Sequence, residues 1–223
     1  MKVISVVNSK GGTGKTTISV NVATRLAMLG NKVLLVDMDE KQNSSLKVVE
    51  IRNGNAELSP ISAVTMKAKS LYKDIQNYSN FDFIVVDAGA GDNELTRATV
   101  ACATFGMLLI PLKASGLDYW VTDDVLNTME EWRSYFTIDN TYLLLNEYDP
   151  KQNMAKGIKE AIDEACGKYQ VKVMETKILN RVAYKESLLN GMNVIEYAEV
   201  KRHTEKAAAE LEALVNEILE ILK

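Results

Sequence analysis

Six continuous apolar runs are the feature that most constrains how this chain folds. In chain order they are "VISVV", "KVLLVD", "FDFIVVD", "FGMLLIPL", "TYLLLN" and "YQVKVME". Because the apolar residues in them are continuous rather than alternating, both faces of each strand should be buried. Strands that alternate with helices predict an α/β fold, with a mostly parallel twisted sheet, helices on both of its faces and right-handed crossovers.

Stretches with helical periodicity separate these runs. One of them, "TTISVNVATRLAMLG", ends at Gly30, and glycine commonly follows the last turn of a helix. We expect further helices around residues 93–103, 118–135, 153–168 and 200–222, a short strand near "PISAVTM" and a helix over "SLYKDIQNY". A chain of 223 residues, 47% of them hydrophobic, suits one core, so we expect a single domain over residues 1–223.

Cysteine content and hydropathy indicate the compartment. The two cysteines, Cys102 and Cys166, are far apart and match no metal-binding spacing. The N-terminus shows no charged leader before a long apolar stretch, and no apolar run approaches the roughly 18 residues that a membrane span needs. We therefore expect a soluble, cytoplasmic protein.

Charge is unevenly distributed along the chain. The formal net charge is −4, yet residues 151–185 contain eight Lys or Arg against four acidic residues. A polyanion could bind such a patch, because contacts to phosphate are mainly electrostatic. The alternative is a solvated helix face, where lysines commonly lie. Sequence alone leaves both interpretations open.

The segment "KGGTGKTT", from Lys10 to Thr17, is typical of a phosphate-binding loop. Ser9 stands where the strict pattern has its first glycine, but an apolar strand, a glycine-rich turn and a helix follow one another as that loop requires. Lys15 would reach the β- and γ-phosphates, and the Thr16 hydroxyl would ligate Mg²⁺. Glycines permit positive φ and close approach of the backbone to phosphate. The predicted nucleotide-binding residues here are Gly11, Gly12, Thr13, Gly14, Lys15, Thr16 and Thr17.

Acidic residues follow two of the apolar runs. Asp87 closes "FDFIVVD", and the residues after it are "AGAG" rather than a catalytic glutamate, so the group that orients water must come from elsewhere. Asp37 and Asp39 lie where "KVLLVD" ends, at the sheet edge where α/β proteins bind ligands. Residues two apart on a strand share a face, so both carboxylates could approach one metal and phosphate. The alternative is a helix-capping role.

These motifs together resemble the ParA/MinD family of partition and positioning ATPases. "KGGTGKTT" is similar to the family's deviant Walker A motif, "VLLVDMD" to Walker A′ and "FDFIVVDAGAG" to Walker B. "IPLKASGLDYW" and "RVAYKESLLNGMNVIEY" resemble later family segments, so the similarity spans essentially the whole chain. The short form, without an N-terminal DNA-binding extension, looks most like small plasmid-type ParA proteins.

The resemblance implies ATP and Mg²⁺ as ligands and a homodimer in which ATP lies between two subunits. Lys15 would act on its own subunit's nucleotide, and the signature lysine Lys10 on the partner's. Asp39 would orient the attacking water, while Asp37 and Asp87 would support Mg²⁺ through its waters. Asn146 is a candidate adenine contact or, alternatively, a turn-forming residue. "DEKQ" departs from the Asp-Pro-Gln of many relatives and puts the conformation of that segment in doubt.

The function implied is a partition ATPase whose ATP dimer binds DNA non-specifically, associates with the nucleoid and is reset by a ParB-like centromere-binding adaptor. Lys156, Lys159, Arg181 and Lys185 are the predicted DNA contacts. One alternative is positioning of a non-DNA cargo, and another is a MinD-like membrane cycle. The C-terminal segment is acidic, which favours core packing and no membrane partner. A nitrogenase-reductase-like carrier would need positioned cysteine ligands, but both cysteines fall within predicted helices.

Overall fold

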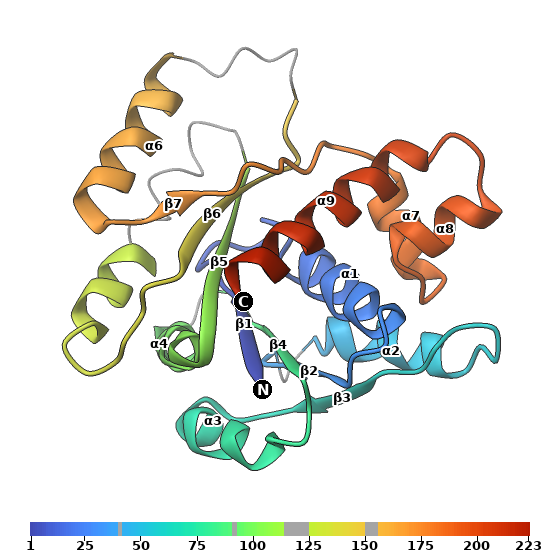
Figure 1. Cartoon of the computed structure of the whole chain (residues 1–223), viewed down its shortest axis with the longest axis horizontal. Coiled ribbons are helices and arrows are strands. Elements are labelled where there is room, and N and C mark those ends of the chain that lie inside the picture. Colours follow the sequence, from blue (N-terminus) through green and yellow to red (C-terminus); the bar gives the residue numbers. More distant parts are fainter. Residues whose placement is uncertain (40–41, 91–92, 114–124, 150–155) are drawn as a thin grey trace.

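The computed structural model describes residues 1–39, 42–90, 93–113, 125–149 and 156–223. They build one seven-stranded sheet in the order β3-β2-β4-β1-β5-β6-β7, and all its strand pairs are parallel (Figure 1). The strands are β1 (Lys2–Val6), β2 (Val33–Asp37), β3 (Ser62–Thr65), β4 (Phe83–Asp87), β5 (Gly106–Lys113), β6 (Thr141–Asn146) and β7 (Lys172–Val173). Each of the six apolar runs contributes a strand, and the short strand near "PISAVTM" is β3. The predicted fold class is confirmed.

The described helices include three that the sequence did not predict: α2 (Ser44–Asn53), α7 (Ala183–Leu189) and α8 (Val194–Val200). The others are α1 (Lys15–Met28), α3 (Ala68–Asp74), α4 (Asn93–Cys102), α6 (Lys156–Tyr169) and α9 (Glu205–Ile221), with the short 3₁₀ segments η1 (Ile75–Tyr78) and η2 (Ala103–Phe105). Of the helix predicted over 118–135, only residues 125–132 are described as helical.

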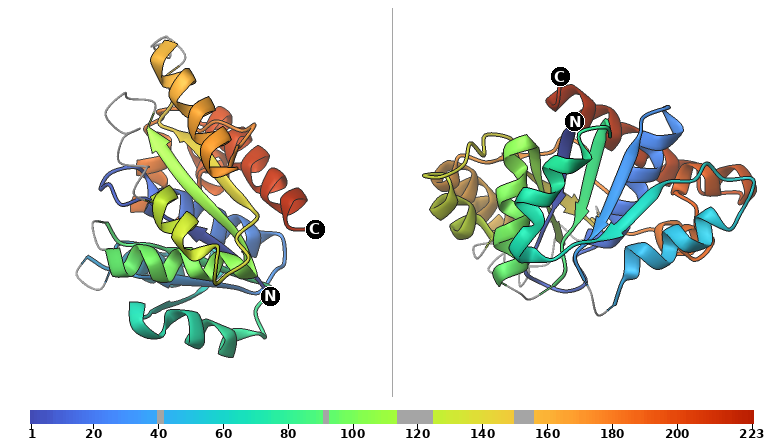
Figure 2. Two further views of the ribbon diagram at one scale, coloured as in Figure 1. Left: turned by 90° about the vertical axis from the view of Figure 1, so that its left-hand side faces the viewer. Right: turned by 90° about the horizontal axis from the view of Figure 1, so that it is seen from below.

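Both faces of the sheet are covered by helices, which explains the continuous apolar runs (Figure 2). On one face, Ile4 and Val85 belong to a core cluster with Leu211 of α9. On the other face, the neighbouring strand residue Val3 packs in a cluster with Leu71 of α3. Successive strand residues thus point into different cores, and each must be apolar.

The C-terminal helix begins later than predicted. The sequence predicts one helix over 200–222, but α8 ends at Val200 and α9 begins at Glu205, with His203 in the left-handed region at φ 68° between them. Leu211, Leu214 and Ile218 of α9 are fully buried, so its apolar stripe packs on the core as expected. Within the described parts of the chain, no helix is both long and apolar enough to cross a membrane.

Candidate nucleotide-binding site

The glycine-rich loop joins β1 to α1 at the carboxyl edge of the sheet. Gly12 has φ 78°, and Gly14, the residue that caps α1, has φ 93°. The left-handed conformation that only glycine adopts easily is therefore used at these two positions. Gly11 does not adopt a positive φ, and an added Cβ would lie 3.8 Å from the Cβ of Ala90, an ordinary contact.

Two buried asparagines hold the loop in place. The Asn8 amide donates to the Pro111 carbonyl oxygen at 3.0 Å, and its own oxygen accepts from the Lys10 backbone N–H at 3.0 Å. Asn146, at the end of β6, donates to the Thr13 carbonyl oxygen at 2.8 Å, and a Cβ on Gly14 would overlap its amide. The sequence offered an adenine contact or a turn for Asn146, and it missed Asn8 altogether. Both asparagines support the phosphate loop.

The Lys15 side chain lies inside the phosphate-binding loop and reaches across it. Its Nζ donates to the Lys10 carbonyl oxygen at 3.0 Å, and its side chain is largely buried. Burial lowers the pKa of Lys15, while the nearby carboxylates of Asp87 and Asp39 act in the opposite direction. A buried ammonium among backbone N–H groups at a helix N-terminus is suited to bind a phosphate group.

The three acidic residues occupy different surroundings. Asp37 and Asp87 are paired in register on adjacent strands, but Asp37 is not among the described residues that line the cavity. Its carboxylate accepts hydrogen bonds from the backbone N–H groups of Ser45 and Leu46 at 3.1 Å and of Asp39 at 2.9 Å. Asp37 therefore caps the N-terminus of α2, which is the alternative that the sequence left open.

Asp39 and Asp87 do line the cavity. The expectation that Asp37 and Asp39 share one face was wrong, because β2 ends at Asp37 and the strand alternation does not extend to Asp39. The Asp39 carboxylate accepts a hydrogen bond from the Gln42 backbone N–H at 3.0 Å, and both residues line the cavity. Asp39 still lines the cavity together with Lys15 and Asp87.

Asp87 and Thr16 form an oxygen-rich corner. The Ser19 hydroxyl donates to the Asp87 carboxylate at 3.3 Å. Burial raises the pKa of Asp87 to about 7, and the charge of Asp37 adds to that rise, whereas the Thr16 hydroxyl and Lys15 lower it. A buried carboxylate beside a hydroxyl fits Mg²⁺, which prefers oxygen ligands and keeps several waters. In the described chain no cluster of three or more His, Cys, Asp or Glu side chains could cage a metal by itself.

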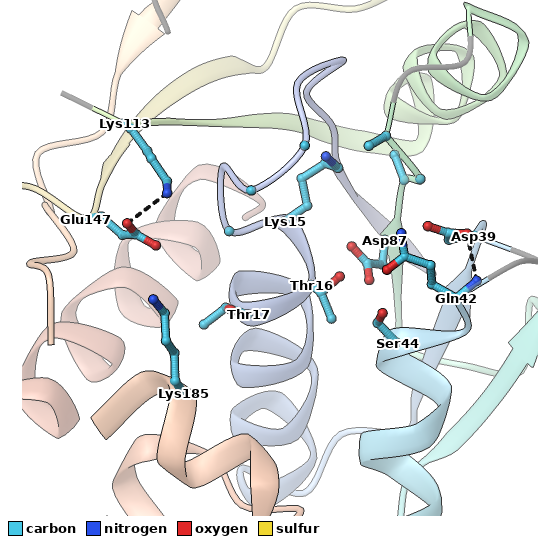
Figure 3. Close-up of a pocket in the computed structure, with 16 residues that line it drawn as sticks. Lys15, Thr16, Thr17, Asp39, Gln42, Ser44, Asp87, Lys113, Glu147 and Lys185 are labelled. Carbon is cyan, nitrogen blue, oxygen red and sulfur yellow. Dashed lines mark hydrogen bonds and ion pairs between the residues drawn. The ribbon is translucent and has the colours of Figure 1, made fainter. Parts of the chain in front are cut away.

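A cavity of about 400 Å³ connects these groups (Figure 3). One end lies between the phosphate loop and Asp39, Asp87 and Ser44, and the other lies against Lys113, Glu147 and Lys185. The volume lies within the range of small-molecule sites. Lys10 is not among the described residues that line it, although Lys15 is.

Of the predicted DNA contacts, Arg181 and Lys185 line one small cavity, whereas Lys156 and Lys159 belong to α6. Lys185 lines the cavity, and Arg181 forms an ion pair with Glu210, with an N–O distance of 2.7 Å. Lys159 is exposed on α6, whose first residue is Lys156, a residue whose side chain lies outside the described part. Figure 1 shows α6 and α7 toward opposite ends of the long axis. The charge count over 151–185 could not reveal this separation.

The parallel sheet, the glycine loop at the start of α1 and the acidic residues after β2 and β4 define a P-loop NTPase. A family model described as an AAA domain matches residues 1–87. Maintenance of carboxysome distribution protein A from Halothiobacillus neapolitanus is 28% identical over 225 residues, which cover 97% of this chain and 95% of that protein. Sporulation initiation inhibitor protein Soj from Bacillus subtilis is 24% identical over 245 residues, which cover 92% of this chain and 94% of Soj.

Solved structures share the fold. Apo McdA from Cyanothece superposes with a TM-score of 0.74 at 18% identity and covers 98% of this chain and 99% of its own. The septum site-determining protein MinD from Pyrococcus horikoshii, complexed with Mg-ADP, has a TM-score of 0.69 at 19% identity. The match covers 97% of this chain and 95% of that chain. In its ordered motifs and its sequence relatives, the chain is similar to the ParA/MinD group of P-loop ATPases.

Proposed function

We propose that this protein is a Mg²⁺-dependent ATPase that positions a cargo inside the cell through a cycle of ATP-driven dimerisation. The observation that carries the proposal is the different placement of the two loop lysines. Lys15 is buried in the cavity, whereas Lys10 is not among the described residues that line it. Because Lys10 does not line the cavity of its own subunit, it is suited to contact the nucleotide that is bound to a facing subunit.

The residues divide the chemistry between them. The backbone N–H groups from Gly11 to Thr17 hold the phosphates, and Lys15 offsets their charge. Thr16 and Asp87 would hold Mg²⁺, and the nearby Asp37 carboxylate adds negative charge to this corner of the site. When bound, the metal would offset negative charge on the transferring phosphoryl group. Asp39 orients the attacking water. Lys10 of the facing subunit adds the last cation.

The cellular role follows from the relatives. Soj is named for an effect on sporulation, and other relatives of this chain are named chromosome-partitioning ATPases. By this analogy, the protein is a small plasmid-type ParA protein with the single domain 1–223. Its ATP dimer binds DNA non-specifically and is released from the DNA by a ParB-like adaptor. The protein would then be cytoplasmic and nucleoid-associated in its ATP state. Lys156 and Lys159 on α6 are the DNA contacts in this proposal, since Arg181 and Lys185 lie at the nucleotide site.

A non-DNA cargo is the second candidate. The relative at 28% identity is named for carboxysome distribution, and its similarity covers 97% of this chain. The same ATP cycle would then distribute a protein assembly, with DNA as the surface on which the dimer moves. The two candidates share every residue assigned to nucleotide binding and hydrolysis.

The proposal is tested by measuring phosphate release and molar mass together. With ATP and Mg²⁺ we expect hydrolysis and a dimer in light scattering after gel filtration, and with ADP a monomer. Chelation of Mg²⁺ should stop phosphate release. A protein that binds no ATP, or that stays monomeric with ATP when hydrolysis is blocked, would contradict the proposed cycle.

A further inference from the structure

Three charged residues form the end of the cavity that lies away from Asp39. Lys113 closes β5, Glu147 directly follows β6, and Lys185 lies on α7. The Lys113 ammonium and the Glu147 carboxylate are 2.9 Å apart, and their side chains are 33% and 26% exposed. Figure 3 shows the Lys185 side chain directed toward Glu147 as well. The carboxylate thus lies near two cations inside the cavity.

The backbone at Glu147 is held in an unfavourable conformation. Its φ of 51° lies in the left-handed region, which is strained for a residue other than glycine. The next residue fixes it there, since the Tyr148 N–H donates to the Ile178 carbonyl oxygen at 2.9 Å and the Tyr148 carbonyl oxygen accepts from Asn180 N–H at 3.1 Å. Such a strained backbone persists only where the surrounding contacts impose it, and here it directs the Glu147 side chain into the cavity.

The phosphate loop fixes which part of a nucleotide would reach this end. Phosphates bound from Gly11 to Thr17 leave the nucleoside to extend past Thr17, which lines both the main cavity and a small adjoining cavity. Glu147 and Lys185 line the same two cavities. The sugar follows the phosphates directly and so lies beside Glu147, while the base extends toward the adjoining cavity at Asn180.

A carboxylate in this place can only accept hydrogen bonds. It would repel a phosphate, but the two ammonium groups offset its charge. Vicinal ribose hydroxyls present two adjacent donors, which match the two oxygens of a carboxylate. We propose that Glu147, held by Lys113 and Lys185, is a specificity-determining residue that binds the 2′ and 3′ hydroxyls of the ribose. This inference rests on the proposed binding of ATP.

The test is calorimetric titration with unlabelled ligands, because ribose-linked fluorophores would modify the hydroxyls in question. Wild-type protein is titrated with ATP, 2′-deoxy-ATP, 3′-deoxy-ATP and inorganic tripolyphosphate, each with Mg²⁺. We expect each deoxy analogue to bind about tenfold more weakly than ATP, as suits a partly exposed hydrogen bond to a charged group. Glu147→Ala should bind ATP about tenfold more weakly and bind all three nucleotides alike.

Tripolyphosphate separates this inference from the proposed function. Its affinity should not fall in Glu147→Ala, because it contacts only the phosphate loop. Glu147→Gln, which keeps one acceptor oxygen, should retain part of the preference for ribose. Glu130→Ala, the matched loss of one exposed carboxylate, should behave as wild type. Equal binding of ATP and the deoxy analogues by wild type, or unchanged discrimination in Glu147→Ala, overturns the inference alone. Failure of wild type to bind either ATP or tripolyphosphate overturns the proposed function.

Discussion

Arg52 and Glu196 join α2 to α8 through a two-point ion pair shielded from solvent. The guanidinium donates to the two carboxylate oxygens at 2.8 and 2.7 Å, and the Arg52 side chain is fully buried. Two further N–H groups of the guanidinium donate to the carbonyl oxygens of Ser59 and Gly191. Since the first turn of α2 binds Asp37, this pair fixes one end of a helix whose other end forms part of the nucleotide site.

Breaking this pair should destabilise the protein strongly. Glu196→Gln leaves a buried guanidinium without its counter-charge, and we expect the free energy of unfolding to fall by about 3–5 kcal/mol. Urea unfolding followed by circular dichroism measures the change. The control is Lys223→Met, which breaks an exposed pair with Glu220 and should cost less than about 1 kcal/mol. Similar losses in the two variants would show that the buried pair has no special role.

The two loop lysines should fail in different ways. Lys15→Ala removes the cation within the cavity and should abolish measurable ATP binding. Lys10→Ala should still bind ATP but lose partner-stimulated hydrolysis, because in the proposed cycle its ammonium acts on the facing subunit. Calorimetry and phosphate release distinguish the variants. An equal loss of ATP affinity in both would refute the division of roles.

Asp39→Ala should bind ATP and Mg²⁺ without turning ATP over. Asp39 lies at the cavity wall, and Ala88 rather than a glutamate directly follows Asp87. The variant should therefore accumulate as an ATP-bound dimer in gel filtration. Asp163→Ala on the exposed side of α6 is the control and should cycle normally. Wild-type phosphate release by Asp39→Ala would remove Asp39 from the mechanism.

Asn146→Asp should weaken binding through the phosphate loop. An aspartate cannot donate to the Thr13 carbonyl oxygen, so a buried oxygen would face another oxygen. We expect the affinities for ATP and for tripolyphosphate to fall by a similar factor, measured by calorimetry. A loss confined to ATP would instead support the adenine contact that the sequence suggested.

DNA binding should depend on α6 and on salt. If Lys156 and Lys159 contact about four phosphates per dimer, log K should fall with log salt concentration at a slope near −3.6. Fluorescence anisotropy of unrelated duplexes with ATP should give equal affinities, since phosphate contacts carry no sequence information. Charge reversal of both lysines should abolish the signal, and Lys73→Glu on α3 should not. Binding that ignores salt would rule out this surface.

Much of the fold could be predicted because burial on both faces dictates the strand sequences. Val3 and Ile4 need apolar partners in different cores, so each strand appears as a continuous run. Helix α2 was missed because its buried residues include Arg52, whose partner Glu196 lies 144 positions away. A buried arginine that pairs with a distant carboxylate interrupts the apolar periodicity by which a helix is predicted from sequence.

The site was predictable to the extent that local sequence determines it. Gly12, Gly14 and Lys15 belong to one continuous loop, and the structure places them together. The direction of Asp37 depends on where β2 ends and α2 begins, and the location of Arg181 depends on Glu210. Such contacts between distant segments arise only when the chain has folded.

Both outer strands of the sheet are short. β3 has four residues and β7 has two, so neither edge presents a long row of unpaired N–H and C=O groups. A second copy of the chain, or an unfolded neighbour, gains few backbone hydrogen bonds by extending the sheet. Copies at high local concentration are thereby protected from irreversible strand pairing.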